Sequence, residues 1–359
     1  TNILLGEISF ITRTVSPILQ LAVSLDYTIF LLHSFNSHRL TVEPEKAMKL
    51  AMKESLSTVA ASAATTMIGF AALIFMRFGI GADLGLNLLK GIIFSFISVM
   101  VFLPALTLTL YRLIDKTRHR KLLPDFKGAG NVLMKIRIPF LVLVLIIAIP
   151  CFLAQSGADF MYGTGNVTKA TRVGKDTAFI EEKFGRQNTL ALLVPKGDTG
   201  TEAELSDALS RLPHVTGVIS YTTAVGAQIP AEFAPDEALE QFYSEHYARI
   251  IINTDTEDEG DEAFDTVRSV LDTASAYYDE YWLAGQSASL YDMRDIVSVD
   301  NRRVSLIAII GIFLVLLVTF RSASMPFLLV FTIETAIWIN LSFPYFTGQP
   351  LNFVGYLII

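Results

Sequence analysis

The sequence predicts a polytopic α-helical membrane protein that also carries an α+β domain outside the cytoplasm. Three observations predict this fold class. Hydrophobic residues make up 52% of the chain and charged residues only 18%, below the quarter that is typical of soluble domains. Six apolar segments are each long enough to cross a bilayer, which takes about 20 residues. The long stretch between the fourth and fifth segments alternates strand-like and helix-like patterns.

The apolar segments set the order of the chain through the membrane. They lie at 14–35, 56–76, 86–111, 138–154, 304–320 and 326–342. The expected membrane regions are therefore 14–111, 138–156 and 302–342. An outer lead-in, 1–13, precedes them, and 343–359 is expected to form an outer loop and the start of a further, truncated span. Because the chain begins at Thr1 without a signal-peptide pattern and ends in an apolar stretch, we expect an internal piece of a longer protein.

Basic residues predict the side of the membrane on which each connection lies, because Lys and Arg favour the cytoplasm. The connection 112–137 holds eight basic and two acidic residues: Arg112, Lys116, Arg118, Arg120, Lys121, Lys127, Lys135 and Arg137 against Asp115 and Asp125. We therefore expect a cytoplasmic basic linker at 112–137 and an extracytoplasmic domain at 157–301. Arg302 and Arg303 lie at an outer helix end against this rule, but the eight residues outweigh them.

The connection between the first two spans is also basic, with Arg39, Lys46, Lys49 and Lys53, and is expected in the cytoplasm. Its stretch "TVEPEKAMKLAMKES" has a proline near a helix start and acidic residues in the first turn. This pattern predicts a short helix lying on the cytoplasmic surface.

Charge is divided unevenly along the chain. Residues 157–301 carry 26 acidic and 10 basic residues, a net charge of −16, whereas the remainder carries 9 acidic and 18 basic residues, a net charge of +9. An acidic soluble domain is therefore set into a basic membrane region. Neither the composition nor the pattern favours binding to nucleic acid.

The residue patterns of cofactor sites and enzymes are absent from the sequence. Cys151 is the single cysteine, which excludes a disulfide within the chain and a cysteine metal site. His119, His214 and His246 lack metal-ligand spacing, and neither a nucleophile–base constellation nor a phosphate-binding glycine loop occurs. We therefore expect no cofactor, no metal and no enzymatic activity.

The domain at 157–301 is expected to hold a ferredoxin-like split βαβ unit. Strand-like patterns lie at 189–195, 215–221, 247–255 and 281–285. Helix-like patterns lie between the first two strands, at 201–212, and between the last two, at 259–278. About 145 residues are enough to bury one hydrophobic core.

One carboxylate lies inside a membrane span. In "LAVSLDYTIFLLHSF", Leu21–Phe35, Asp26 is about 12 residues, or about 18 Å, from the outer end of the span. An aspartate at mid-bilayer costs about 2.5–3.5 kcal/mol on insertion scales, so we expect it to face the helix bundle and to have a partner. Tyr27 points about 100° away from it on the helix. The alternative is a structural aspartate that holds helices together by hydrogen bonds.

Two intramembrane residues are candidate partners of Asp26. Lys90 lies in the outer half of its span and has a stem long enough to reach the depth of Asp26; the alternative is a lysine that extends to the headgroup layer. Glu334 lies close to mid-depth in the last complete span and could serve proton or substrate passage; the alternative is a packing contact to Asn340 or to serines.

The order of several motifs resembles the RND superfamily of transporters, and specifically its MMPL-type branch. The motifs are "DYTIFLLHSF", "GFAALIF", "FLPAL", "FGRQNTLALLVPKGD", "GQSASLYDMRDIVSVD" and "FRSASMPFLLV". The resemblance covers nearly the whole chain. It implies twelve spans in two parallel halves, with 14–111 as the fourth to sixth spans and 157–301 as the second porter domain.

The same resemblance implies a function. It assigns Asp26 and Tyr27 to a proton relay, with a matching acidic residue in a tenth span outside this chain. The expected protein is a proton-motive-force-driven exporter of lipids or other hydrophobic molecules in the inner or plasma membrane of a prokaryote. Its expected partners are membrane lipids, a lipid substrate and protons. The alternative is an RND-like lipid sensor or receptor, or a translocation accessory protein, without net substrate transport.

Overall fold

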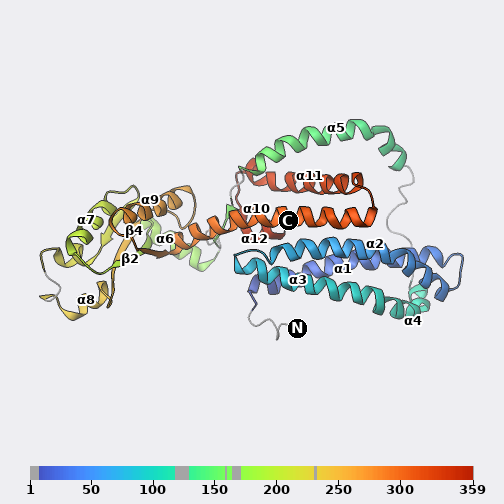
Figure 1. The fold of residues 1–359 in the computed structure, drawn as a ribbon, viewed down its shortest axis with the longest axis horizontal. Coiled ribbons are helices and arrows are strands. Elements are labelled where there is room, and N and C mark those ends of the chain that lie inside the picture. The colour runs from blue at the N-terminus through green and yellow to red at the C-terminus, as the bar shows by residue number, and fades with distance from the viewer. Residues whose placement is uncertain (1–7, 118–128, 158–159, 164–170, 230–232, 359) are drawn as a thin grey trace. The chain divides into compact units, whose positions relative to one another are not determined.

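The computed structural model describes residues 8–117, 129–157, 160–163, 171–229 and 233–358. The chain divides into two compact units (Figure 1). The first comprises 1–158 and 297–349 and contains the membrane helices, and the second comprises 159–296 and 350–358. Four basic residues of the expected cytoplasmic linker, Arg118, Arg120, Lys121 and Lys127, lie outside the described residues.

Among the residues that the structure describes, six helices are long and apolar enough to cross a membrane, which confirms the predicted number of spans and a multi-pass membrane protein. Five are α1 (Phe10–His38), α2 (Pro44–Leu73), α5 (Ala129–Gln155), α10 (Gln286–Phe320) and α11 (Ser324–Thr347). The sixth consists of α3 (Gly79–Ile97), a π-helical turn η2 (Ser98–Phe102) and α4 (Leu103–Lys116).

Helices α1, α2 and α3 pack side by side in the first unit (Figure 1). One face of α1, with Tyr27, Leu31 and Phe35 at every fourth position, is buried in a shared apolar core. Gly85 of α3 lets α2 approach closely, because a Cβ atom there would lie 2.7 Å from the carbonyl oxygen of Phe70. This packing fixes which face of α1 stays uncovered.

Several helices extend beyond the apolar segments that predicted them. Residues 44–55, expected as a separate surface helix, are the first turns of α2, and they bury Ala47, Met48 and Ala51. That expectation was wrong because small apolar residues continue the packing face without a break. Helix α10 begins at Gln286, within the second unit, and α11 continues to Thr347 through residues expected to be loop.

The second unit is built on a four-stranded antiparallel sheet with strand order β3-β4-β2-β5. Its strands are β2 (Asn188–Pro195), β3 (Val215–Ile219), β4 (Tyr247–Thr254) and β5 (Trp282–Gly285). Helix α7 (Thr199–Ser210) follows β2 and α9 (Asp261–Tyr277) follows β4. This is the order of a ferredoxin-like βαββαβ unit, so the predicted α+β fold of this unit is confirmed.

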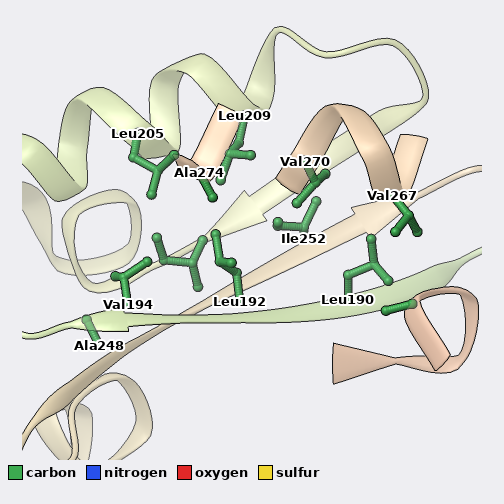
Figure 2. Packing of buried hydrophobic residues seen from close by; sticks show 12 residues of the cluster. Leu190, Leu192, Val194, Leu205, Leu209, Ala248, Ile252, Val267, Val270 and Ala274 are labelled. Carbon is green, nitrogen blue, oxygen red and sulfur yellow. The ribbon is translucent and has the colours of Figure 1, made fainter. Parts of the chain in front are cut away.

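The core of the second unit lies between the sheet and its two helices (Figure 2). Burial alternates along β2, where Leu190, Leu192 and Val194 face inward. Leu209 of α7 and Val270 of α9 are fully buried against them. The alternation explains why the strands could be predicted from the sequence.

Further elements of the second unit did not follow from the sequence pattern. Helices α6 (Arg172–Phe184) and α8 (Asp236–Phe242) and a π-helical turn η3 (Thr222–Gly226) are present. Strands β1 (Phe160–Met161) and β6 (Leu351–Asn352) pair in parallel, and α12 (Phe353–Ile358) follows. The residues expected to approach a further span therefore include a short strand and a short helix.

Candidate functional site

Asp26 lies in the middle of α1 on the face that α2 and α3 leave uncovered. It follows the first residue of the 29-residue helix by 16 positions, or about 24 Å. Its side chain is exposed, as are Ala22 and Ile29 on the same face. Asp26 forms no hydrogen bond or ion pair with any residue that the structure describes. Within this chain the carboxylate therefore does not face the α1–α2–α3 core, because Tyr27, Leu31 and Phe35 occupy that side.

Tyr27 has the opposite environment. Its side chain is 3% exposed and packs in the core that Leu31 and Val59 share. Its hydroxyl is buried and has no hydrogen-bond partner in the described part of the chain. A buried hydroxyl without a partner costs about 1–3 kcal/mol, so its presence calls for an explanation.

Lys90 takes part in a polar cluster on α3 with Asn87 and Asp83. Its Nζ donates to Asn87 Oδ1 at 3.1 Å, and Asn87 Nδ2 donates to Asp83 Oδ1 at 3.0 Å. The structure therefore joins Lys90 to the polar face of its own helix and not to Asp26. The Lys90–Asp26 pair stays a prediction.

Glu334 lies on α11, which packs against α5. Its side chain is half-buried and is hydrogen-bonded by the side chain of Trp338, one turn further along the helix. Trp338 in turn makes an edge contact with Phe152 of α5, with the ring centroids 4.8 Å apart. Glu334 and Asp26 are not brought into contact, and the role of Glu334 also stays a prediction.

A set of polar contacts between α1 and α3 did not follow from the sequence. Ser24 Oγ donates to Ser95 Oγ at 2.7 Å, and Gln20 Nε2 donates to the Gly91 carbonyl oxygen at 3.3 Å. Polar residues at every fourth position of an otherwise apolar helix were the signal that could have revealed them.

A second missed residue is Asp300 of α10, which is 1% exposed. Its Oδ2 accepts the backbone N–H groups of Arg77 and Phe78, at 2.7 and 3.0 Å, in the connection between α2 and α3. Its Oδ1 is buried and has no partner among the described residues. An acidic residue just before an apolar segment was the available signal.

The second unit buries one carboxyl group. Glu202 of α7 is 3% exposed, and its Oε2 accepts from the hydroxyl of Tyr243 at 2.8 Å. Burial raises the pKa of the Glu202 carboxyl above its ordinary value. The hydrogen bond from Tyr243 lowers this pKa, but by less than burial raises it. The pKa of the Tyr243 hydroxyl is also raised. Burial is the larger cause, and the hydrogen bond to Glu202 is the second.

Helix α6 of the second unit carries an exposed apolar stripe. Val173, Ile180 and Phe184 lie on one helical face and are each more than half exposed. The stripe leads to a hollow of about 320 Å³, which is lined by Thr177, Ile180, Glu181, Phe184, Gly185 and Gln187. Such a surface suits an apolar ligand better than a charged one. In the described part of the chain, no cluster of His, Cys, Asp and Glu could hold a metal ion.

Comparison with known proteins identifies a family to which the chain is similar and a solved structure with a similar fold. The model of the MMPL family matches residues 1–126 and 169–351. A protein of Methanocaldococcus jannaschii described as a membrane protein is 37% identical over 89 residues, which cover 24% of this chain and 23% of that protein. The crystal structure of SecDF in its super-membrane-facing form resembles 97% of this chain, with a TM-score of 0.52 and 14% identity. This chain covers 41% of that SecDF chain.

Proposed function

Because the chain belongs to the MMPL family, we propose that it forms part of a transporter that uses the proton gradient to export lipids or other hydrophobic molecules across a prokaryotic cell membrane. The relay would consist of Asp26 and Tyr27. The chain spans less than half of the solved structure that it resembles, so the proposal concerns the protein of which this chain is a part.

The observation that carries the proposal is the position of Asp26 at mid-helix on an apolar face. A charged carboxylate at mid-bilayer is costly, by about 2.5–3.5 kcal/mol, and protonation removes most of this cost. The protonated side chain can lie against apolar surfaces, whereas the charged one needs a cation, a hydrogen-bond donor or water. Loading and release of a proton would therefore change which surface this face of α1 can contact.

Partners for the charged form are available in principle. Lys90 could supply a cation if its Nζ left Asn87. Glu334 could pass protons on a different helix, α11. Both are proposals that a second structure, with Asp26 in the other protonation state, would test.

The exposed stripe of α6 supports a hydrophobic substrate. Val173, Ile180 and Phe184 present apolar surface outside the membrane region, next to a hollow with a few polar groups at its rim. A lipid tail could cover this surface during passage through the extracytoplasmic domain. Burial of the acyl chain would supply the binding energy, and the polar groups at the rim would orient the lipid.

The test is whether proton movement and substrate movement occur together. Full-length protein in vesicles, with a trapped pH-sensitive dye and a fluorescently labelled phospholipid as probe, should take up protons only when it moves the lipid. An ionophore that collapses the gradient should stop lipid movement. Vesicles that bind the lipid without any proton flux would contradict the proposal and favour a lipid sensor or receptor.

A further inference from the structure

Helices α1 and α3 face each other with polar side chains at a constant register. Gln20 is opposite Gly91, and Ser24 is opposite Ser95, with an offset of 71 residues in both pairs. The same offset, carried one and two turns outward, places Ser16 beside Asn87 and Thr12 beside Asp83. Ser9 confirms this alignment, because its backbone N–H donates to Asp83 Oδ2 at 3.0 Å.

These residues lie along one line where α1 and α3 face each other, and we call this line the α1–α3 seam. Its members recur at every fourth position: Thr12, Ser16, Gln20 and Ser24 on α1, and Asp83, Asn87, Gly91 and Ser95 on α3. From the first to the last member on α1 the line is about 18 Å long. It therefore leads from the first turns of the two helices, where Asp83 lies, to the depth of Asp26.

The eight residues of the seam are all buried or partly buried. Thr12, Asn87 and Ser95 are each less than 9% exposed. Gly91 leaves room for Gln20, since a Cβ atom at that position would lie 3.0 Å from Gln20 Oε1. The backbone and the side chains of both helices are thus arranged to enclose polar groups within apolar spans, which is costly unless the groups have a use.

Two hydroxyls along the seam lack partners. Ser16 Oγ is buried and makes no hydrogen bond within the described residues, and the same holds for the Tyr27 hydroxyl. Tyr27 lies three positions after Ser24 and hence on the same side of α1. The seam therefore ends on the side of α1 that carries Tyr27, and the side chain of Asp26, the preceding residue, points about 100° away from it.

We propose that the α1–α3 seam is the path by which protons enter from the outer face and reach Tyr27 and then Asp26. The inference rests on the proposed function and extends it. Each hydroxyl or intervening water would accept a proton on its outer side and release one on its inner side, and Gln20 would orient Ser95. The last proton goes to the Asp26 carboxylate, which becomes a neutral carboxylic acid.

The rival explanation is that the seam only holds α1 and α3 together. Interhelical hydrogen bonds do stabilise membrane helices, by about 0.6 kcal/mol on average. Such a role needs bonded groups, and it leaves the Ser16 and Tyr27 hydroxyls unexplained. The π-helical turn η2, Ser98–Phe102, begins three residues after Ser95 and marks a further irregularity next to the inner end of the seam.

The first experiment compares proton uptake by variants of the full-length protein in vesicles containing a pH-sensitive dye. The test variant is Ser24→Ala with Ser95→Ala, which removes the 2.7 Å contact but keeps small side chains. The control is Thr319→Ala, because the Thr319 hydroxyl bonds only a carbonyl of its own helix. We expect the test variant to take up protons at least about tenfold more slowly than the wild type, because a positioned proton-transfer path is interrupted. The control should take up protons at the wild-type rate.

Asp26→Asn separates the two proposals. If Asp26→Asn abolishes uptake but the folded Ser24→Ala, Ser95→Ala protein keeps the wild-type rate, the seam is not the path and the proposed function stands. If Asp26→Asn keeps the wild-type rate, the proposed function fails and the path loses its acceptor. A loss of thermal stability without a loss of uptake per folded molecule identifies the seam as helix packing alone.

The second experiment does not depend on removing a hydrogen bond. In full-length protein in which Cys151 and every cysteine outside this chain are replaced by alanine, Ser16→Cys is compared with Ile18→Cys, which lies at nearly the same depth on the exposed apolar face. A water-soluble methanethiosulfonate reagent added from the outer side should modify the cysteine at position 16 faster than the one at position 18. Equal rates, or no reaction at position 16, would overturn the proposal.

Discussion

Asp300 and Arg77 are 223 residues apart in the sequence, yet the Asp300 carboxylate accepts the backbone N–H of Arg77 at 2.7 Å. The same oxygen accepts the N–H of Phe78 at 3.0 Å. The contact ties α10 to the connection between α2 and α3, close to the start of α3. Asp300 therefore holds α10 against the α2–α3 connection within the membrane unit.

Asp300→Ala should destabilise the membrane unit, because two backbone N–H groups lose their acceptor. The expected loss is about 1–3 kcal/mol for each unsatisfied group. Asp300→Asn retains an acceptor oxygen and should recover most of the loss. Thermal denaturation in detergent measures the effect, with Asp292→Ala, an exposed position on the same helix, as control. A melting temperature equal to that of the control would contradict this role.

Tyr27→Phe should separate stability from function. The substitution removes a buried hydroxyl that has no partner in the described structure, so the folded state should be unchanged or stabilised by about 1 kcal/mol. Proton uptake and lipid export should nevertheless fall, since the hydroxyl is the proposed link between the α1–α3 seam and Asp26. A Tyr27→Phe protein with wild-type export would remove Tyr27 from the relay.

Gly85→Ala should disturb the packing of α2 on α3. The new Cβ atom would lie 2.7 Å from the Phe70 carbonyl oxygen and 2.9 Å from Leu73 Cβ, and backbone atoms cannot move away cheaply. Overpacking of this kind costs about 1–3 kcal/mol. Gly79→Ala is the matched control, because no atom lies within 4 Å of a Cβ there. Equal melting temperatures for the two variants would show that α2 and α3 are not closely packed at Gly85.

The stability of the second unit should depend on pH through Glu202. Burial raises the pKa of this carboxyl in the folded protein, so the folded state keeps a proton that the unfolded chain has already lost. The free energy of unfolding should therefore fall as the pH rises from the ordinary pKa of a glutamate through the raised one. Glu202→Gln should remove this slope, and Glu204→Gln, at an exposed position on the same helix, should leave it intact.

Urea unfolding followed by tryptophan fluorescence measures this slope. This chain has two tryptophans, so replacing Trp338 and every tryptophan outside this chain by phenylalanine leaves Trp282 in β5 as the reporter of the second unit. A slope that persists in Glu202→Gln would assign the pH dependence to another group.

Much of the fold could be predicted because periodicity and length carry the information. Long apolar runs gave the six spans, and alternation gave β2 and β4 almost to the residue. Helix ends were predicted less well. Helix α10 begins 18 residues before the apolar segment at 304–320, because polar helical residues outside a span leave no hydropathy signal. The resemblance to the MMPL-type branch is confirmed by the family match.

The candidate site could be predicted only in part. Asp26 is recognisable in the sequence because a carboxylate in an apolar run is unusual. The direction in which the Asp26 side chain faces cannot be predicted from the sequence, since it depends on how α1 packs on α2 and α3. The contacts of Lys90, the unpartnered Tyr27 hydroxyl and the seam all depend on the register between α1 and α3, which local sequence does not encode.

The most direct test of the account is lipid export by the full-length Asp26→Asn protein under an imposed pH gradient. The substitution keeps the size of the side chain but removes its ability to take up and release a proton. The matched control is Asp207→Asn, an exposed carboxylate of the second unit that pairs with Arg211 at 3.0 Å. We expect the Asp26→Asn protein to fold and to bind the labelled phospholipid without exporting it, while the control exports normally. Export by Asp26→Asn at the wild-type rate would contradict the account.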